Sequence, residues 1–257
     1  MADIFKKLNH FASGKSVLAG IVAANAIVFL LIWTSMLVSR SLGYGNMANW
    51  LILPPSFEET ILQPWSIATY MFTHIRLFHL VANMAWLYCF GIIFLDLYPN
   101  RALMRTYIAG GLAGAILYLA AGAVHSLNGL AGASAAVLAI AAATVVRAPN
   151  YGIRLFVFGI VKIKWVAAAF VLFALLTTDI HAIGSHAAHI GGIAAGCAIA
   201  LNARYGIFRR SEPVRKPAVD IEHRLDELLD KVKTSGYNSL SAREKKELSD
   251  LSGKIEL

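Results

Sequence analysis

Four side chains that could together perform nucleophilic catalysis lie within three long apolar stretches of the sequence. Ser134 opens an alanine-rich stretch, and His189 lies in a later one. A hydroxyl beside an imidazole is the minimum for covalent catalysis, because the imidazole removes the hydroxyl proton during attack and returns a proton to the leaving group. His79 and Asn83, in an earlier stretch, could donate N–H groups to a developing oxyanion, as could the unpaired backbone N–H of Ser134 at its helix start.

These polar residues share one depth if the apolar stretches are membrane-spanning helices. Ser134, Asn83 and His189 precede the charge that ends their own stretch by 13, 13 and 15 residues. At about 1.5 Å per helical residue, each lies roughly 20 Å above that charge. Because the hydrocarbon core is ~30 Å thick, all three would lie about 10 Å below the opposite surface. Polar groups are costly there, so they are candidates for function.

The stretch that begins at Ser134 is too short to cross the membrane. The loop before it must then enter the protein, because irregular backbone at that depth needs protein or a water-filled cavity beside it. Ser134 should therefore lie on the floor of such a cavity. We expect Gly132, Gly192 and Gly196 to lie at close helix contacts, which would bring His189 to the serine. No acidic residue lies in these outer helical halves, so a Ser134–His189 dyad is expected.

The composition indicates a polytopic membrane protein. Of the 257 residues, 58% are hydrophobic and 15% are charged, against about half and about a quarter in soluble domains. The net charge of +8 does not indicate a nucleic-acid partner, because the basic residues lie in loops between apolar stretches. Six spanning helices are predicted, near residues 17–38, 77–95, 102–124, 134–146, 165–178 and 186–203.

The distribution of basic residues orients these helices. With the N-terminus inside, every inside segment is rich in Lys and Arg, whereas the outside segments hold only Arg40 and Arg76. Both termini are therefore expected in the cytosol. The predicted organisation is a cytosolic lead at 1–16, a six-helix domain at 17–205, a linker at 206–218 and a cytosolic helical extension at 219–257.

The extension has the sequence pattern of a helical hairpin. Apolar residues recur at helical spacing over 219–234, and Gly236 ends that helix. Ser241 and Glu244 fit a capping box that starts a second, short helix. The hairpin could be a packing or solubilising tail, or it could bind a cytosolic partner.

Three motifs in these stretches resemble those of the rhomboid family of intramembrane serine proteases. The similarity covers about residues 17–205 and rests on HxxxN, GxSG and AHxxGxxxG motifs, here His79-Leu-Val-Ala-Asn83, Gly132-Ala-Ser134-Ala135 and Ala188-His189-Ile-Gly-Gly192-Ile-Ala-Ala-Gly196. The resemblance implies that Ser134 is the nucleophile and His189 the base. It also implies that His79 and Asn83 bind the oxyanion.

The resemblance further implies an all-α bundle of six transmembrane helices with a short fourth helix. The expected activity is cleavage of single-span or polytopic membrane proteins through an acyl-enzyme, near the outer ends of their spans, with no cofactor and no metal. The expected location is a bacterial inner membrane, with both termini in the cytosol. Three positions depart from the family's pattern: Ser66 stands where an arginine is usual, Ala135 replaces the last glycine of GxSG, and Leu138 stands where an aromatic often lies under the base.

Each site residue also has a plain structural interpretation. Ser134 could be a helix N-cap, His189 a buried core histidine, and His79 with Asn83 a structural hydrogen bond between helices. His186 lies one turn from His189 and is a competing base. Two further histidines fit loop or interface positions better, namely His74 and His125.

Two other functions compete with proteolysis. A non-catalytic rhomboid-like protein that binds membrane helices is the main alternative, although such proteins usually lack the serine or the histidine. A transporter or channel is the weaker alternative, because no inverted repeat or row of intramembrane charges is visible.

Overall fold

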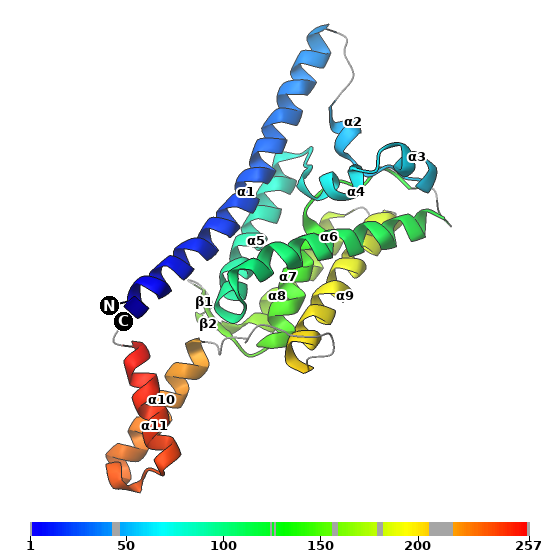
Figure 1. Cartoon of the computed structure of the whole chain (residues 1–257). Coiled ribbons are helices and arrows are strands. Elements are labelled where there is room, and N and C mark those ends of the chain that lie inside the picture. The colour runs from blue at the N-terminus through cyan, green and yellow to red at the C-terminus, as the bar shows by residue number, and fades with distance from the viewer. Residues whose placement is uncertain are drawn as a thin grey trace.

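The computed structural model describes residues 2–42, 47–123, 125, 127–155, 159–178, 182–205 and 218–255. Its main body is an all-α membrane bundle, shown in Figure 1, and the predicted fold class is confirmed. Each predicted span lies on one helix of this bundle. The six helices are α1 (Ala2–Leu42), α5 (Leu77–Leu97), α6 (Asn100–Gly122), α7 (Ser134–Arg147), α8 (Ile163–Thr177) and α9 (Ile183–Tyr205).

The remaining elements are short. Four of them make up the segment 47–76, which connects α1 to α5: α2 (Ala48–Leu51), α3 (Phe57–Leu62), α4 (Ser66–Thr69) and the 3-10 turn η1 (Tyr70–Phe72). Between α7 and α8 lies an antiparallel hairpin of β1 (Gly152–Leu155) and β2 (Gly159–Lys162), which the sequence pattern does not predict. The chain ends in α10 (Ala218–Ser235), η2 (Tyr237–Ser239) and α11 (Ala242–Ile255).

Two of the six bundle helices are too short to span a bilayer alone. Within the described residues, α1, α5, α6 and α9 are long and apolar enough to cross. With 14 and 15 residues, α7 and α8 are only about 21–23 Å long, less than the ~30 Å of hydrocarbon. The spans predicted from the sequence at 134–146 and 165–178 have nearly these lengths.

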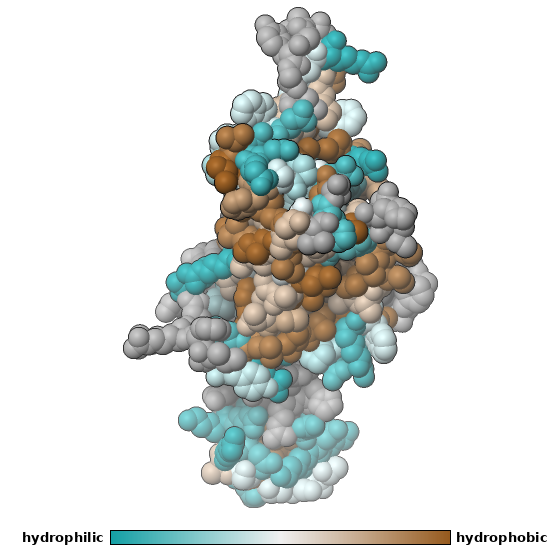
Figure 2. Space-filling view, turned by 90° about the vertical axis from the view of Figure 1, so that its right-hand side faces the viewer, coloured by the Kyte–Doolittle hydropathy of each residue, from teal (hydrophilic) through white to brown (hydrophobic). Residues whose placement is uncertain are grey.

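Large apolar side chains cover the outside of the bundle. On the face shown in Figure 2, they form a brown band between hydrophilic ends. An apolar surface of this extent needs lipid around it. Its exposed side chains include Leu30, Leu37, Val81, Ile116, Leu172 and Leu176.

At the centre of the bundle is α7. Every residue from Ala135 to Ala141 is buried, and the helix packs against α5, α6, α8 and α9. Its many alanines explain how four neighbours fit around one helix, because small side chains let backbones approach closely. Nothing on α7 is left to face lipid along this stretch.

Glycines on α9 and α6 make the closest of these approaches. A Cβ placed on Gly192 or Gly196 would lie 2.1 Å from the backbone oxygen of Ala135 or Ala139, so α9 touches the α7 backbone directly. A Cβ on Gly114 of α6 would likewise lie 2.7 Å from the methyl carbon of Ala135. The structure thus places Gly192 and Gly196 at the close contact that their spacing predicts.

Hydrogen bonds anchor the segment 47–76 to the bundle without the usual arginine at Ser66. The Tyr70 hydroxyl donates to the Gly111 carbonyl at 2.6 Å, and the Tyr107 hydroxyl donates to the Met71 carbonyl at 2.8 Å. Within the segment, the Trp65 indole N–H donates to the Trp50 carbonyl at 2.7 Å. Ser66 itself is fully buried. The segment therefore has other anchors where the family pattern has an arginine.

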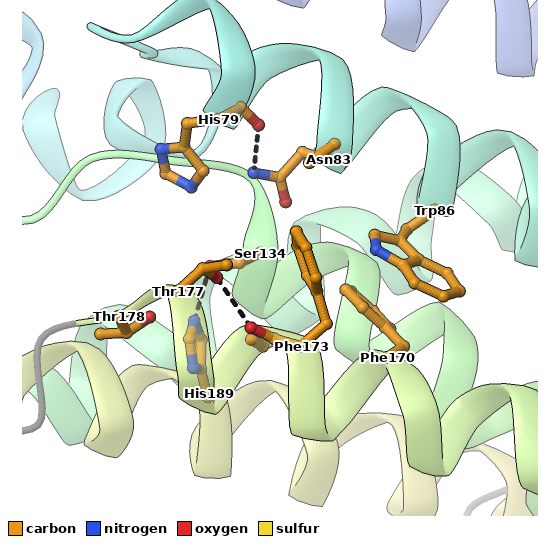
Figure 3. Close-up of a pocket in the computed structure, with 11 residues that line it drawn as sticks. His79, Asn83, Trp86, Ser134, Phe170, Phe173, Thr177, Thr178 and His189 are labelled. Carbon is orange, nitrogen blue, oxygen red and sulfur yellow. Dashed lines mark hydrogen bonds between the residues drawn. The ribbon is translucent and has the colours of Figure 1, made fainter.

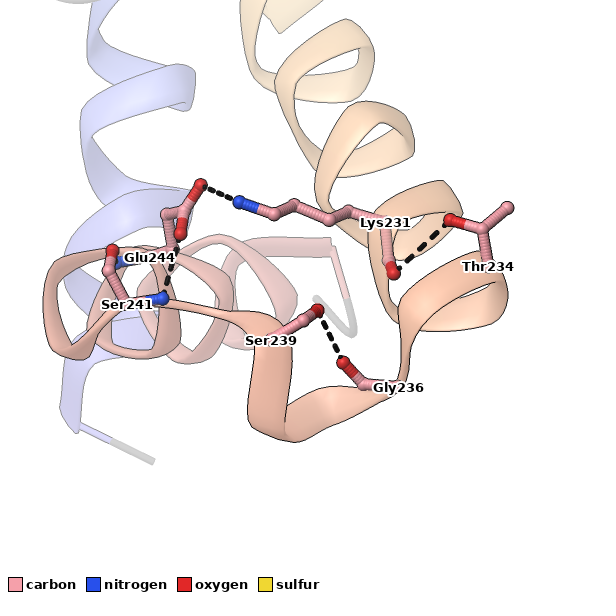
Figure 4. Close-up of polar contacts among 6 residues, drawn as sticks. All are labelled: Lys231, Thr234, Gly236, Ser239, Ser241 and Glu244. Carbon is pink, nitrogen blue, oxygen red and sulfur yellow. Dashed lines mark hydrogen bonds and ion pairs between the residues drawn. The ribbon is translucent and has the colours of Figure 1, made fainter.

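The C-terminal extension forms the predicted helical hairpin around a small core of Leu228 and Leu240. Gly236 ends α10 with a φ of +77°, a conformation that favours glycine. Figure 4 shows Lys231 bound to the Glu244 carboxylate at 2.8 Å, and Glu244 in turn accepting from the Ser241 N–H at 2.8 Å. The predicted linker lies outside the described residues except at Ala218.

We expect Gly196→Ala to destabilise the bundle, because the new methyl would collide with the α7 backbone. Overpacking of this kind costs about 1–3 kcal/mol. Gly20→Ala is the matched control, since nothing lies within 4 Å of a Cβ at that position of α1. Denaturant unfolding in detergent micelles would measure both variants. Equal unfolding free energies for the two would contradict this description of the α7–α9 contact.

The C-terminal hairpin should lose stability in acid. The Lys231 ammonium and the Ser241 N–H lower the pKa of Glu244 from 4.5 to about 2, so their stabilisation is present above pH 4.5 and is lost as the pH falls toward 2. Amide exchange of residues 218–255, corrected for intrinsic rates, should show this loss in the full chain. The loss of stability in acid should be absent in Glu244→Gln. It should be retained in Asp226→Asn, which removes another exposed carboxylate of the hairpin. The same acid response in Glu244→Gln and wild type would refute it.

Candidate active site

The structure brings Ser134 and His189 into direct contact. Ser134 is the first residue of α7 and His189 lies in the N-terminal half of α9. The Ser134 Oγ atom is 2.8 Å from the His189 Nε2 atom. Figure 3 draws this contact as a dashed line. The histidine is buried, with 8% of its surface exposed. His186, the competing base, has its ring centroid 6.3 Å from that of His189, and His189 is the histidine at hydrogen-bond distance from the serine.

A small pocket of about 40 Å³ lies beside these two side chains. This volume has room for water next to the serine hydroxyl. Aromatic side chains of α5 and α8 form one wall of it (Figure 3), with Trp86 stacked on Phe170 at a centroid distance of 4.7 Å. One side of the pocket is therefore closed by apolar rings, and its other side is lined by polar side chains.

The polar side of the pocket contains His79 and Asn83. The Asn83 amide donates one N–H to the His79 carbonyl at 2.9 Å. An asparagine amide carries two N–H bonds, so the second is available to a group in the pocket. All residues predicted to act on an oxyanion, His79, Asn83 and Ser134, line this one pocket.

Gly132 lies in close contact with the His79 side chain of α5. Its φ is +129°, and a Cβ there would lie 2.5 Å from Cε1 of His79. Two needs meet at Gly132, a backbone turn with positive φ and space for the His79 ring of α5. Both needs exclude a side chain at this position.

The segment that leads into Ser134 is bound through its backbone to the segment 47–76. Leu130 and Leu53 exchange two backbone hydrogen bonds, of 2.9 and 3.0 Å, and the Gly132 N–H donates to the Tyr70 carbonyl at 3.0 Å. The Ala133 N–H donates to Nε2 of His74 at 3.4 Å. Three of the four residues before Ser134 are therefore held by hydrogen bonds to the segment 47–76.

His74 is a residue whose role the sequence does not reveal. It was expected at a loop or interface position, but it is fully buried, and its ring meets the His79 ring edge-on at 5.1 Å. Burial lowers the pKa of His74 to about 3, so the ring is neutral near pH 7 and can accept the Ala133 N–H. A lone histidine carries no periodic signal that would predict this contact. His125, in contrast, is exposed.

The departures from the motif pattern at Ala135 and Leu138 fit the packing. The Ala135 methyl lies against Gly114, which leaves the space that the methyl needs. Leu138 is buried, with 2% of its surface exposed. Within the described residues, Nδ1 of His189 has no hydrogen-bond partner, and no group of three His, Cys, Asp or Glu could hold a metal ion.

Comparison with known proteins finds two matching family models. A "Rhomboid domain" matches residues 62–205, and a "Family of unknown function (DUF6576)" matches residues 219–254. The chain is 25% identical to the human presenilin-associated rhomboid-like protein, mitochondrial, over 219 residues, which are 83% of this chain and 55% of that protein. It is 33% identical to the Arabidopsis thaliana RHOMBOID-like protein 12, mitochondrial, over 107 residues, which are 42% of this chain and 30% of that protein.

The Danio rerio presenilin-associated rhomboid-like protein A, mitochondrial, is 26% identical over 80% of this chain and 52% of its own length. The chain thus spans about half the length, or less, of these curated relatives. All three are named as mitochondrial proteins. The expected location in a bacterial inner membrane is therefore wrong, and the assignment of both termini to the cytosol, which belongs to it, is withdrawn.

We expect His74→Leu to destabilise the protein, because the buried Ala133 N–H would lose its acceptor. An unsatisfied buried donor costs about 1–3 kcal/mol. His74→Gln offers a replacement acceptor and should recover part of the loss, and the exposed His125→Leu should leave the unfolding free energy unchanged. If His74→Leu unfolds at the same denaturant concentration as His125→Leu, the hydrogen bond between His74 and Ala133 does not contribute to stability.

Proposed function

Because the chain belongs to the rhomboid family, we propose that it is an intramembrane serine protease that cleaves membrane-spanning proteins. The observation that carries the proposal is the 2.8 Å contact between Ser134 Oγ and His189 Nε2. This contact lies at a pocket with room for water inside a bundle whose outer surface is apolar. A nucleophile, a base and water together are what peptide hydrolysis needs.

In the first step Ser134 Oγ attacks the carbonyl carbon of the scissile peptide bond. The hydroxyl proton passes to Nε2 of His189, and the carbonyl oxygen becomes an oxyanion. Three donors surround that position in the proposal: the Ser134 backbone N–H, the free N–H of Asn83 and the His79 ring. When the C–N bond breaks, His189 returns its proton to the departing amine, which leaves an ester on Ser134.

In the second step water hydrolyses this ester. His189 takes a proton from the water as its oxygen attacks the acyl carbon, and the same oxyanion donors act again. The bond to Ser134 Oγ then breaks, and the serine oxygen regains a proton from His189. No cofactor or metal enters either step, and the base works in this scheme as one member of a dyad.

The substrates in this proposal are single-span or polytopic membrane proteins. The proposal assigns its chemistry to the six-helix domain at 17–205, and it leaves the extension at 219–257 as a possible site for a partner. A non-catalytic protein that binds membrane helices is the alternative, and the following experiment separates the two.

We expect Ser134→Ala and His189→Ala each to lower cleavage of a single-span substrate in proteoliposomes by about 10⁴-fold or more. A fluorophosphonate probe should label wild type but not Ser134→Ala. Ser35→Ala and His186→Ala are controls that remove the same residue types elsewhere on α1 and α9. Mass spectrometry of the products would locate the cut. Normal cleavage by both active-site variants would rule out the dyad, and an unlabelled wild type that cuts no member of a substrate panel would favour the binding protein.

A further inference from the structure

A second, larger cavity adjoins the pocket at Ser134. Its volume is about 360 Å³, within the range of ligand sites. It shares His79, Ala82, Phe173, Thr177 and Thr178 with the smaller pocket. Because the two spaces have these walls in common, a peptide segment held in the larger cavity would continue to the serine.

Among the described residues in the wall of the larger cavity, Arg76 is the one that carries a charge. The other described residues that line it are apolar, or carry hydroxyl, imidazole or backbone groups, and no carboxylate is among them. Arg76 is exposed, and no ion pair joins it to any described residue. A guanidinium is always charged and binds a carboxylate through two parallel hydrogen bonds. Among the residues that the structure describes, this cation has no negative partner in the cavity.

The local backbone adds to this positive charge. Arg76 is the N-cap residue of α5, and no side chain caps that helix end. A helix N-terminus carries a partial positive charge and unpaired N–H groups. His79 follows Arg76 by three residues, about 4.5 Å along the helix. The positive region thus lies close to the position of the scissile bond in the proposed reaction.

We propose that Arg76 selects substrates that carry an acidic side chain close to the scissile bond. This inference rests on the proposed protease function and adds a substrate class to it. An extended chain advances about 3.3 Å per residue, so four positions on either side of the cut cover about 13 Å of chain in each direction. Hydroxyl groups of Thr177, Thr178 and Ser185 line the same cavity and can bind the polar backbone of such a segment.

The test compares three versions of one single-span substrate, with Asp, Asn or Lys placed in turn at each of the four positions on either side of the cut. In vesicles of zwitterionic lipid, wild type should cleave the best Asp substrate with about tenfold higher kcat/KM than its Asn version, and the Lys version more slowly still. Arg76→Glu should reverse this order, so that Lys is preferred. Arg40→Glu is the matched control, because Arg40 is the other arginine predicted on this side of the membrane and does not line the cavity.

Equal kcat/KM for the three substrates in wild type would overturn the inference. The inference would also be overturned if Arg76→Glu cut all three substrates more slowly by one common factor, and if the size of this loss changed when anionic lipid was added to the vesicles. That result would mean that Arg76 binds a lipid phosphate. Binding of the same peptides to Ser134→Ala, followed by fluorescence anisotropy, should give the same order without any cleavage. A failure of the protease function would thus appear as absent cleavage, and a failure of the arginine's role as absent discrimination.

Discussion

Backbone N–H groups at the start of α7 need partners at a depth where lipid offers none. A helix of 14 residues that ends at Arg147 must begin inside the membrane. The residues before it then bring irregular backbone into a region where an unpaired N–H costs about 1–3 kcal/mol. Several contacts in the structure provide hydrogen-bond partners for this backbone.

The segment 47–76 supplies those partners. Leu53 pairs with Leu130, the Tyr70 carbonyl accepts from Gly132, and His74 accepts from Ala133. This segment is itself tied to α6 through the Tyr70 and Tyr107 hydroxyls. A connection that looks like a long surface loop in sequence is thus a structural part of the core. The segment 47–76 does not pair with the Ser134 N–H in the first turn of α7. In the proposed mechanism this N–H donates a hydrogen bond to the oxyanion.

The sequence predicts the features that depend on simple counting. Apolar stretches and basic loops give six helices, and the distance from Ser134 to Arg147 gives the short α7. The hairpin of β1 and β2 was not predicted, because β2 leads directly into α8 and hydropathy does not separate a short strand from a helix end. His74 was hidden for another reason: its partner, the Ala133 N–H, is a backbone group that no residue type reveals. The expected membrane, a bacterial inner membrane, was wrong because sequence motifs describe the chemistry of a site and not the membrane that contains it.

The position of His189 relative to Ser134 follows from helix contact rather than from a third polar residue. In a catalytic triad, an acidic group orients the base, but among the described residues Nδ1 of His189 has no partner. Gly192 instead touches the Ala135 carbonyl, one residue after the serine and one turn after the histidine. Backbone-to-backbone contact leaves little freedom for either helix to slide or rotate, because no side chain lies between them to change rotamer. The 2.8 Å separation of nucleophile and base is therefore set by the absence of a Cβ, and this makes the glycine face of α9 as much a part of the proposed active site as the histidine that it carries.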